Sequence, residues 1–156
     1  MPATLRMRHA AALPLLLAAL VIGSLFAFVP PADAALSRAQ RVSSAFDIVR
    51  AQKGDPYRYG AAGPNAFDCS GLMQYAYAAA GISLPHSSRM QSTMGVPVSR
   101  AALQPGDLLF FYSPVSHVGM YIGNGQMVHA STYGEPVKVA SIDSMGSLTG
   151  ARRIAG

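Results

Sequence analysis

The sequence predicts one domain of the α+β class, in which N-terminal helices pack on an antiparallel sheet. Two stretches of helical periodicity, 38–53 and 69–80, come first. From Leu108 onward the pattern changes to short apolar or alternating runs that are typical of strands. Gly123-Asn124-Gly125 marks a hairpin turn between two of these runs. Helices followed by strands favour a segregated α+β arrangement over alternating βαβ units.

Residues 1–34 have the layout of a secretory signal peptide. Arg6 and Arg8 form a positive start, an apolar run follows, and Ala32-Asp33-Ala34 is a small-x-small cleavage site. We therefore expect an exported protein (secreted, periplasmic or cell-wall associated) with its domain at 35–156. The apolar run is also long enough to span a bilayer, so a retained membrane anchor is the competing interpretation.

The charge of the chain suits an anionic envelope surface better than a nucleic acid. Its net charge is +5, and charged residues make up only 12 % of the sequence. Beyond Arg152-Arg153 there is no cluster of basic residues, and no basic helix carries interleaved aromatics. This diffuse basicity argues against nucleic-acid binding and suits a bacterial envelope. We expect membrane contact only through the N-terminal segment.

The first helix is expected over 38–53. Ser37 and Gln40 have the spacing of a capping box, and Gly54 supplies the stop. Its apolar residues recur on one face, which indicates a surface helix with one buried stripe.

The second helix carries the only cysteine, Cys69, near its start. The glycine- and proline-rich run 60–65 places that start near Asp68 or Cys69, and Gly81 ends the helix. Apolar residues follow the cysteine at the spacings of one helical face: Leu72, Met73, Ala76, Tyr77 and Ala80.

Cys69 could be a small core residue or a reactive thiol. Unpaired N–H groups and the positive end of a helix dipole stabilise a thiolate at a helix N-terminus. An exported protein with one cysteine forms no internal disulfide, and its free thiol is open to oxidation. Those two points favour a thiol kept for its chemistry.

The remaining elements are short. We expect a loop over 82–89 in which His86 is solvated, and a helical turn over 91–94. Tyr57 and Tyr59 precede the cysteine and either line a cleft or only pack their rings. Strands are expected over these ranges: 96–98, 108–112, 117–122, 126–130, 137–140 and 151–154.

The hairpin register decides whether His117 and His129 share a face. A two-residue loop at Asn124-Gly125 would point the two imidazoles to opposite faces, because the side-chain period of a strand is two. A three-residue loop, or a bulge of equal effect, puts residue 129 opposite Gly119 and both imidazoles on one face. The second register sorts the apolar residues better, so we adopt it.

These residues have the ingredients of thiol catalysis. His117 can take the proton of Cys69 and form an ion pair that holds the thiolate. His129 can bond the other ring nitrogen of His117 and fix its tautomer. Asp68 is expected to cap the helix or to bind a cationic substrate group. A zinc site, or two unrelated surface histidines, are the alternatives.

Four stretches, in order, resemble the NlpC/P60 cysteine peptidases, which are papain-like bacterial cell-wall hydrolases. They are AFDCSGLMQYAYAAAG, LPHSSRMQ, LQPGDLLFFYS and HVGMYIGNGQMVHA, and the resemblance runs from about Asp55 to Ser141. It implies a papain-like NlpC-type fold with Cys69 as nucleophile, His117 as base and His129 as the residue that orients the base.

The resemblance also implies a substrate, the stem peptides of peptidoglycan. The bond usually cleaved joins γ-D-glutamate to a diamino acid such as diaminopimelate. No metal or cofactor is implied. In members specific for stems with a free N-terminal L-alanine, four positions hold the amine, and the matching residues here are Tyr57, Asp68, Ser70 and Ser88.

Two other functions remain open at this point. A papain-like amidase or acyltransferase would use the same cysteine and histidine with another acceptor. A catalytically silent wall-binding protein could keep the fold with a blocked cleft. The segments 83–94 and 144–156 are the ones most able to cover the site.

Overall fold

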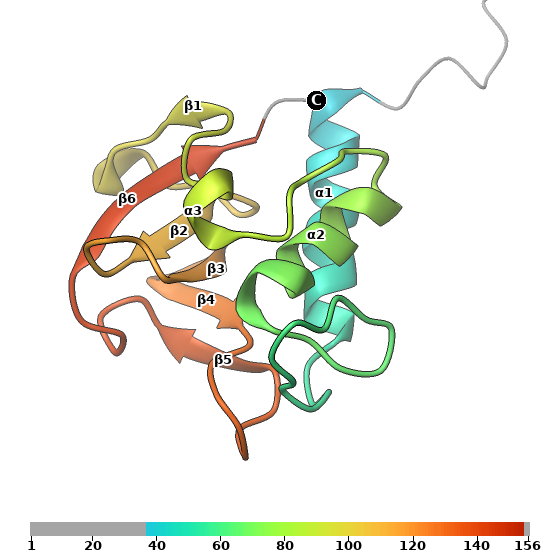
Figure 1. Ribbon diagram of the computed structural model, residues 1–156. Helices are drawn as coiled ribbons and strands as arrows, with labels where there is room; N and C mark the ends of the chain where they lie inside the picture. The colour runs from blue at the N-terminus through green and yellow to red at the C-terminus, as the bar shows by residue number, and fades with distance from the viewer. Residues whose placement is uncertain (1–36, 155–156) are drawn as a thin grey trace, which may run out of the picture. The chain divides into compact units, whose positions relative to one another are not determined.

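The computed structural model describes residues 37–154 of the chain (Figure 1). The predicted signal peptide lies outside these residues, so cleavage and export stay predictions. None of the described helices is long and apolar enough to cross a membrane. The elements are α1 (Arg38–Ala51), α2 (Cys69–Ala79), α3 (Ser88–Gln91), β1 (Val96–Pro97), the 3-10 turn η1 (Arg100–Ala102), β2 (Leu108–Phe111), β3 (His117–Gly123), β4 (Gln126–His129), β5 (Lys138–Ser141) and β6 (Leu148–Arg153).

The six strands form one antiparallel sheet in the order β1-β6-β2-β3-β4-β5. Figure 1 shows α1 and α2 side by side next to this sheet, and α2 packs against β3. The predicted α+β class is therefore confirmed. Since β3 lies inside the sheet, the N-terminus of α2 is held against an element that pairs on both sides.

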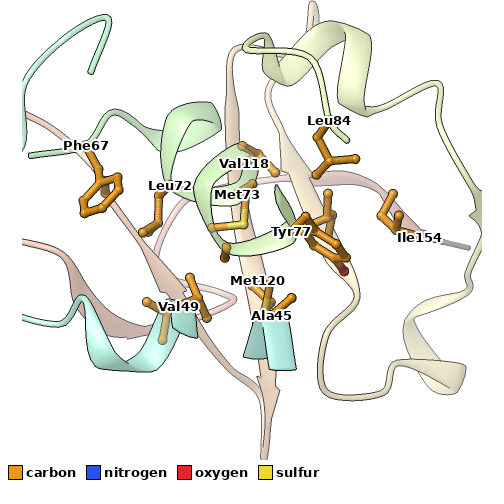
Figure 2. Close-up of a cluster of buried hydrophobic side chains, with 14 of the residues drawn as sticks. Ala45, Val49, Phe67, Leu72, Met73, Tyr77, Leu84, Val118, Met120 and Ile154 are labelled. Carbon is orange, nitrogen blue, oxygen red and sulfur yellow. The ribbon is translucent and has the colours of Figure 1, made fainter. Parts of the chain in front are cut away.

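The main core lies between the helices and one face of the sheet. Val118 and Met120 of β3 point into it with Leu72, Met73 and Tyr77 of α2, as Figure 2 shows. Alternate residues of the strands point to the other face, where a smaller apolar cluster forms. Its buried members are Leu109, Phe111, Met127, Ile142 and Ala151.

The first helix starts and ends as its sequence predicts. Gln40 donates its backbone N–H to Ser37 Oγ at 3.4 Å, and Ser37 donates to Gln40 Oε1 at 2.7 Å, so the capping box is formed. The last helical residue is Ala51, two residues before the predicted end, and Gly54 has a φ of +103°. That left-handed conformation lets glycine turn the chain away from the helix.

The hairpin between β3 and β4 has the predicted effective register. Tyr121 pairs with Met127, a bulge follows, and Gly123 pairs with Gln126. The closing turn is thus Asn124-Gly125, whose φ angles of 52° and 69° suit a two-residue hairpin turn. The bulge has the effect expected of a three-residue loop, so residue 129 lies opposite residue 119.

The structure differs from the sequence prediction in one connecting segment and shows where another lies. The short helix begins at Ser88, not at Gln91, because Ser87 caps it by accepting the N–H of Met90 at 3.4 Å. The described part of the C-terminal segment does not cover the cysteine. It forms β6, which lies between β1 and β2 in the sheet.

Candidate active site

Cys69 is the first residue of α2, and Asp68 is its N-cap. The Asp68 Oδ1 atom accepts the N–H of Gly71 at 2.7 Å, which satisfies one of the free donors at the helix start. A Cβ atom at position 71 would collide with the carbonyl group of Ala61. Only glycine therefore lets the loop before the helix pass directly over its first turn and fix the place of the thiol.

Next to Cys69 the surface opens into a cleft of about 380 Å³. The resemblance assigns four residues to substrate binding, and the structure brings all of them to this cleft. The lining residues are Tyr57, Tyr59, Gly60, Asp68, Cys69, Ser70, His86, Ser87, Ser88 and Ser116. The segment 83–94 therefore forms one wall of the cleft and leaves the thiol accessible.

His117 and His129 form a buried pair, 5 % and 1 % exposed. Nε2 of His117 lies 2.9 Å from Nδ1 of His129, and the two rings meet edge to face. A Cβ atom at Gly119 would lie 3.3 Å from the Cβ of His129 and 2.9 Å from the Met127 sulfur. Gly119 thus makes room for the second imidazole, as the predicted register requires.

The hydrogen bond between the rings links their tautomers. If His117 donates from Nε2, its Nδ1 is free to accept a proton, and His129 accepts on Nδ1. The proton of His129 then sits on Nε2, a buried atom with no hydrogen-bond partner among residues 37–154. This assignment is the one in which His117 can act as a base.

The thiol reaches β3 at the strand's first residues. The backbone N–H of Val118 stabilises the Cys69 thiolate, and Ser116 lines the cleft with Cys69. His117 lies between Ser116 and Val118 in the chain. The Cys69 thiol therefore lies beside the segment 116–118, which contains His117. Within the described residues the thiol makes no hydrogen bond to the His117 ring.

Burial controls the protonation of this group. It raises the pKa of the Cys69 thiol, against the effect of the Val118 amide, and the nearby Asp68 carboxylate raises that pKa further. Burial lowers the pKa of His117 to about 4, helped by the neighbouring His129. Burial, helped by Lys138, lowers the pKa of His129 to about 4 as well. These directions favour a neutral thiol beside neutral imidazoles, in contrast to the expected ion pair.

His86, expected to be solvated, contacts a buried carboxylate instead. Its Nε2 atom lies 2.9 Å from both carboxylate oxygens of Asp68. Asp68 also accepts hydrogen bonds from Gly60 N at 2.9 Å, from Ser70 Oγ at 3.2 Å and from Gly71 N. Sequence reasoning missed His86 because the contact joins residues 18 apart and leaves no local pattern.

Tyr57 does both things that a loop tyrosine was expected to do. Its ring packs edge to face on Tyr133, with centroids 5.3 Å apart, and it lines the cleft. In residues 37–154 no three histidine, cysteine or acidic side chains gather in a way that could hold a metal ion.

Comparison with known proteins connects this geometry to a family. The profile of the NlpC/P60 family matches residues 54–152. A probable endopeptidase of Mycobacterium tuberculosis is 51 % identical over 126 residues, which cover 81 % of this chain and 32 % of that protein. The probable endopeptidase p60 of Listeria monocytogenes is 47 % identical over 103 residues, 64 % of this chain and 21 % of that protein. The chain therefore spans about a third or less of the length of these relatives.

Solved structures share the fold. The P60 domain of the Mycobacterium avium subspecies paratuberculosis antigen MAP1204 aligns with a TM-score of 0.70 at 31 % identity, over 78 % of this chain and 99 % of that one. The peptidoglycan hydrolase RipB of M. tuberculosis aligns with a TM-score of 0.69 at 30 % identity, over 82 % of this chain and 69 % of that one. Both likenesses confirm the predicted NlpC-type architecture.

Proposed function

The chain belongs to the NlpC/P60 family, and from this premise we propose that it is an exported cysteine peptidase that hydrolyses the stem peptides of peptidoglycan. Relatives named probable endopeptidases and a structural neighbour named a peptidoglycan hydrolase support the class of reaction and the polymer. The observation that carries the proposal is the position of Cys69, at a helix N-terminus and on the wall of an open cleft.

In the proposed reaction, the Cys69 sulfur attacks the carbonyl carbon of the scissile amide while His117 Nδ1 takes the thiol proton. Because the resting groups are neutral, proton transfer accompanies the attack. The N–H groups of Cys69 and Ser70, at the start of α2, bind the oxygen that becomes negative. His117 then gives its proton to the leaving amine, and a thioester to Cys69 remains.

Water completes the reaction. His117 takes a proton from the water that attacks the thioester, and the acid product leaves with the thiol restored. His129 acts as a positioning residue: its Nδ1 atom lies 2.9 Å from His117 Nε2. In the tautomer in which it accepts from that atom, Nδ1 of His117 stays unprotonated.

The finer assignments follow the family resemblance. The proposed bond is the one between γ-D-glutamate and a diamino acid such as diaminopimelate, and no metal enters the reaction. Tyr57, Asp68, Ser70 and Ser88 are the proposed substrate-binding residues, and their shared place on the cleft beside Cys69 supports that role. Export rests on the predicted signal peptide, residues 1–34.

The test is product analysis by mass spectrometry. The purified protein and its Cys69→Ala variant are incubated with intact peptidoglycan and with stem peptides. A new γ-D-glutamyl cleavage product from the unsubstituted protein alone is the expected result. If the folded protein with a reduced thiol gives no product, the silent wall-binding function replaces the peptidase. A peptide joined to an added amine without any hydrolysis product identifies an acyltransferase instead.

A further inference from the structure

A second, smaller cavity lies beside β6, outside the cleft that contains Cys69. Its volume is about 200 Å³. Arg152 of β6 is the only charged residue among those that line it, so we call it the Arg152 pocket. Four of its other lining residues carry a hydroxyl group: Ser92, Tyr112, Ser113 and Thr149.

Arg152 brings unused hydrogen-bond donors to this pocket. Its Nε atom donates to the Ser92 carbonyl at 2.7 Å, which ties β6 to the end of α3. The two terminal amino groups of its guanidinium form no ion pair or hydrogen bond with residues 37–154. The next residue, Arg153, differs in this respect, because it binds Asp107 through two N–H groups at 2.8 Å each. A permanently charged guanidinium with free planar donors favours a carboxylate as ligand.

The turn after β2 adds polar groups to the same pocket. The side chains of Tyr112 and Ser113 form no hydrogen bond within the described part of the chain. Tyr112 has a φ of 72°, a left-handed conformation that is unfavourable for a bulky side chain. Such strained residues are most common at functional sites. The turn therefore supplies two further donors beside a strained backbone.

The pocket is open directly beside the guanidinium. Gly150 lies within β6, and a Cβ atom at this position would meet no atom within 4 Å. Because alternate residues of a strand point to the same face, position 150 faces the side on which the Arg152 side chain lies. A ligand group therefore has free room next to the unused donors.

A short ridge separates the Arg152 pocket from the cleft. The ridge consists of α3 and the turn 113–116. Ser88 and Ser116 line the cleft on one side of it, whereas Ser92 and Val115 line the pocket on the other. Four helical residues rise by about 6 Å, and an extended peptide covers that distance with about two residues. One stem peptide can therefore reach both cavities.

Glutamine side chains fix this ridge to α2. Buried Gln91, the last residue of α3, donates to the carbonyls of Ser70 at 3.0 Å and of Pro85 at 2.8 Å. Gln74 of α2 donates to the Leu84 carbonyl at 3.0 Å. The separation between the start of α2, which carries the thiol, and the Arg152 pocket is therefore built into the fold.

The proposed reaction supplies a carboxylate for the pocket. The residues assigned to the N-terminal part of the stem line the cleft, on the acyl side of the scissile bond. The part that leaves as the amine extends from Cys69 in the other direction, and it carries carboxylates on a diaminopimelate side chain and at its C-terminus. We propose that the Arg152 pocket binds a carboxylate of this leaving part. The inference rests on the proposed function and adds a second substrate-binding site to it.

Calorimetry on the Cys69→Ala protein tests this binding apart from cleavage. The reference peptide is L-Ala-γ-D-Glu-diaminopimelyl-D-Ala. One analogue has lysine in place of diaminopimelate and lacks the side-chain carboxylate, and the other has a C-terminal amide. Loss of the carboxylate that binds Arg152 should weaken binding by about tenfold or more, as expected for charge-assisted hydrogen bonds. The analogue that binds more weakly identifies the source of the carboxylate.

Two outcomes of this comparison would overturn the inference. One is that both analogues bind within about threefold of the reference peptide. The other is that none of the three peptides binds to the folded protein. Failure of the proposed peptidase is read separately, as absent cleavage by the protein that retains Cys69.

Two variants in the same Cys69→Ala protein test the pocket itself. Arg152→Gln removes the charge, and Gly150→Leu fills the free room while keeping Arg152. Each should bind the three peptides within about threefold of one another, with circular dichroism as the check on the fold. A preference of tenfold or more that survives in either folded variant would overturn the inference.

Arg89→Gln is the matched control. It removes an equal charge from exposed Arg89 of α3, which lines neither the cleft nor the Arg152 pocket. The preference for the reference peptide should therefore be kept. An equal loss in Arg89→Gln and Arg152→Gln would show a general charge effect and contradict a binding site at Arg152.

Discussion

Two pairs of side chains near the thiol contain histidine, and they differ in what surrounds them. His117 and His129 are buried against apolar residues and have each other as their polar partner. His86 lies on the cleft and faces the carboxylate of Asp68. The first pair is buried and lacks a carboxylate, whereas the second is partly exposed and contains one.

Histidine therefore has two different roles near the thiol. Burial without a counter-ion lowers the pKa of both imidazoles of the first pair to about 4, so a base is present at neutral pH. In the second pair the His86 imidazole donates a hydrogen bond to the Asp68 carboxylate. We expect the first pair to determine the rate and the second to shape the wall of the cleft beside Cys69.

The largest effect should come from removing the base. His117→Ala should lower kcat/KM for stem-peptide cleavage by about a thousandfold or more. Steady-state kinetics with peptide cleavage followed by mass spectrometry measures it, and circular dichroism checks the fold. If His86→Ala lowered kcat as strongly as His117→Ala, the division of tasks between the two pairs would be wrong.

Removal of the positioning residue should cost less. His129→Leu should lower kcat by roughly 10- to 100-fold, because the base stays but its tautomer and orientation are no longer fixed. His129→Asn offers an oxygen that can accept from His117 Nε2 and should stay within about tenfold of the unsubstituted protein. Equal losses for Leu and Asn would contradict an orienting hydrogen bond.

The first pair should also make stability depend on pH. In the unfolded chain a histidine titrates near pH 6.5, whereas His117 and His129 titrate near 4 when folded. Between these values the unfolded chain binds more protons, so the free energy of unfolding falls as pH is lowered from about 6.5 to about 4. Urea unfolding across this window should show a loss of several kcal/mol, up to about 3 kcal/mol for each histidine.

The control for that measurement is the double variant His117→Gln/His129→Gln. Its free energy of unfolding should change less over the same pH window, because the two titrating groups are gone. A pH dependence of the same size in the double variant would show that His117 and His129 do not cause it.

The smallest effect should be the stability cost of His86→Ala. The substitution removes one partly exposed hydrogen bond, and Asp68 keeps its other three donors. We expect a loss of about 1 kcal/mol, measured by urea unfolding at pH 7. A loss several times larger would show that the pair serves mainly to hold the loop on α2.

The sequence is most informative where local chemistry decides the structure. Periodicity, the capping box and Gly81 predict both long helices to within two residues, because caps and apolar faces are local signals. The hairpin register follows from sorting apolar side chains to one face. Ser87 is a capping signal too, and attention to it would have placed the start of α3 correctly.

The parts of the site that were not predicted depend on burial and on distant contacts. The residue types Cys69 and His117 suggest an ion pair, but the pKa directions come from how deeply the fold buries them. The Asp68–His86 contact depends on how Gln91 ties the loop to α2, which no short pattern encodes. The cleft residues were assigned from the resemblance, and their common location emerges only in three dimensions.

The hydrogen bonds from Gln74 and Gln91 also make one wall of the cleft a separate, anchored segment of the chain. The proposed catalytic groups belong to α2, β3 and β4, whereas His86, Ser87 and Ser88 belong to one short segment anchored by those two glutamines. If residues 84–91 were exchanged between relatives and both glutamines were kept, one wall of the cleft would be replaced as a unit. The shape of this wall can therefore change through a single surface segment while the residues of α2, β3 and β4 stay unchanged.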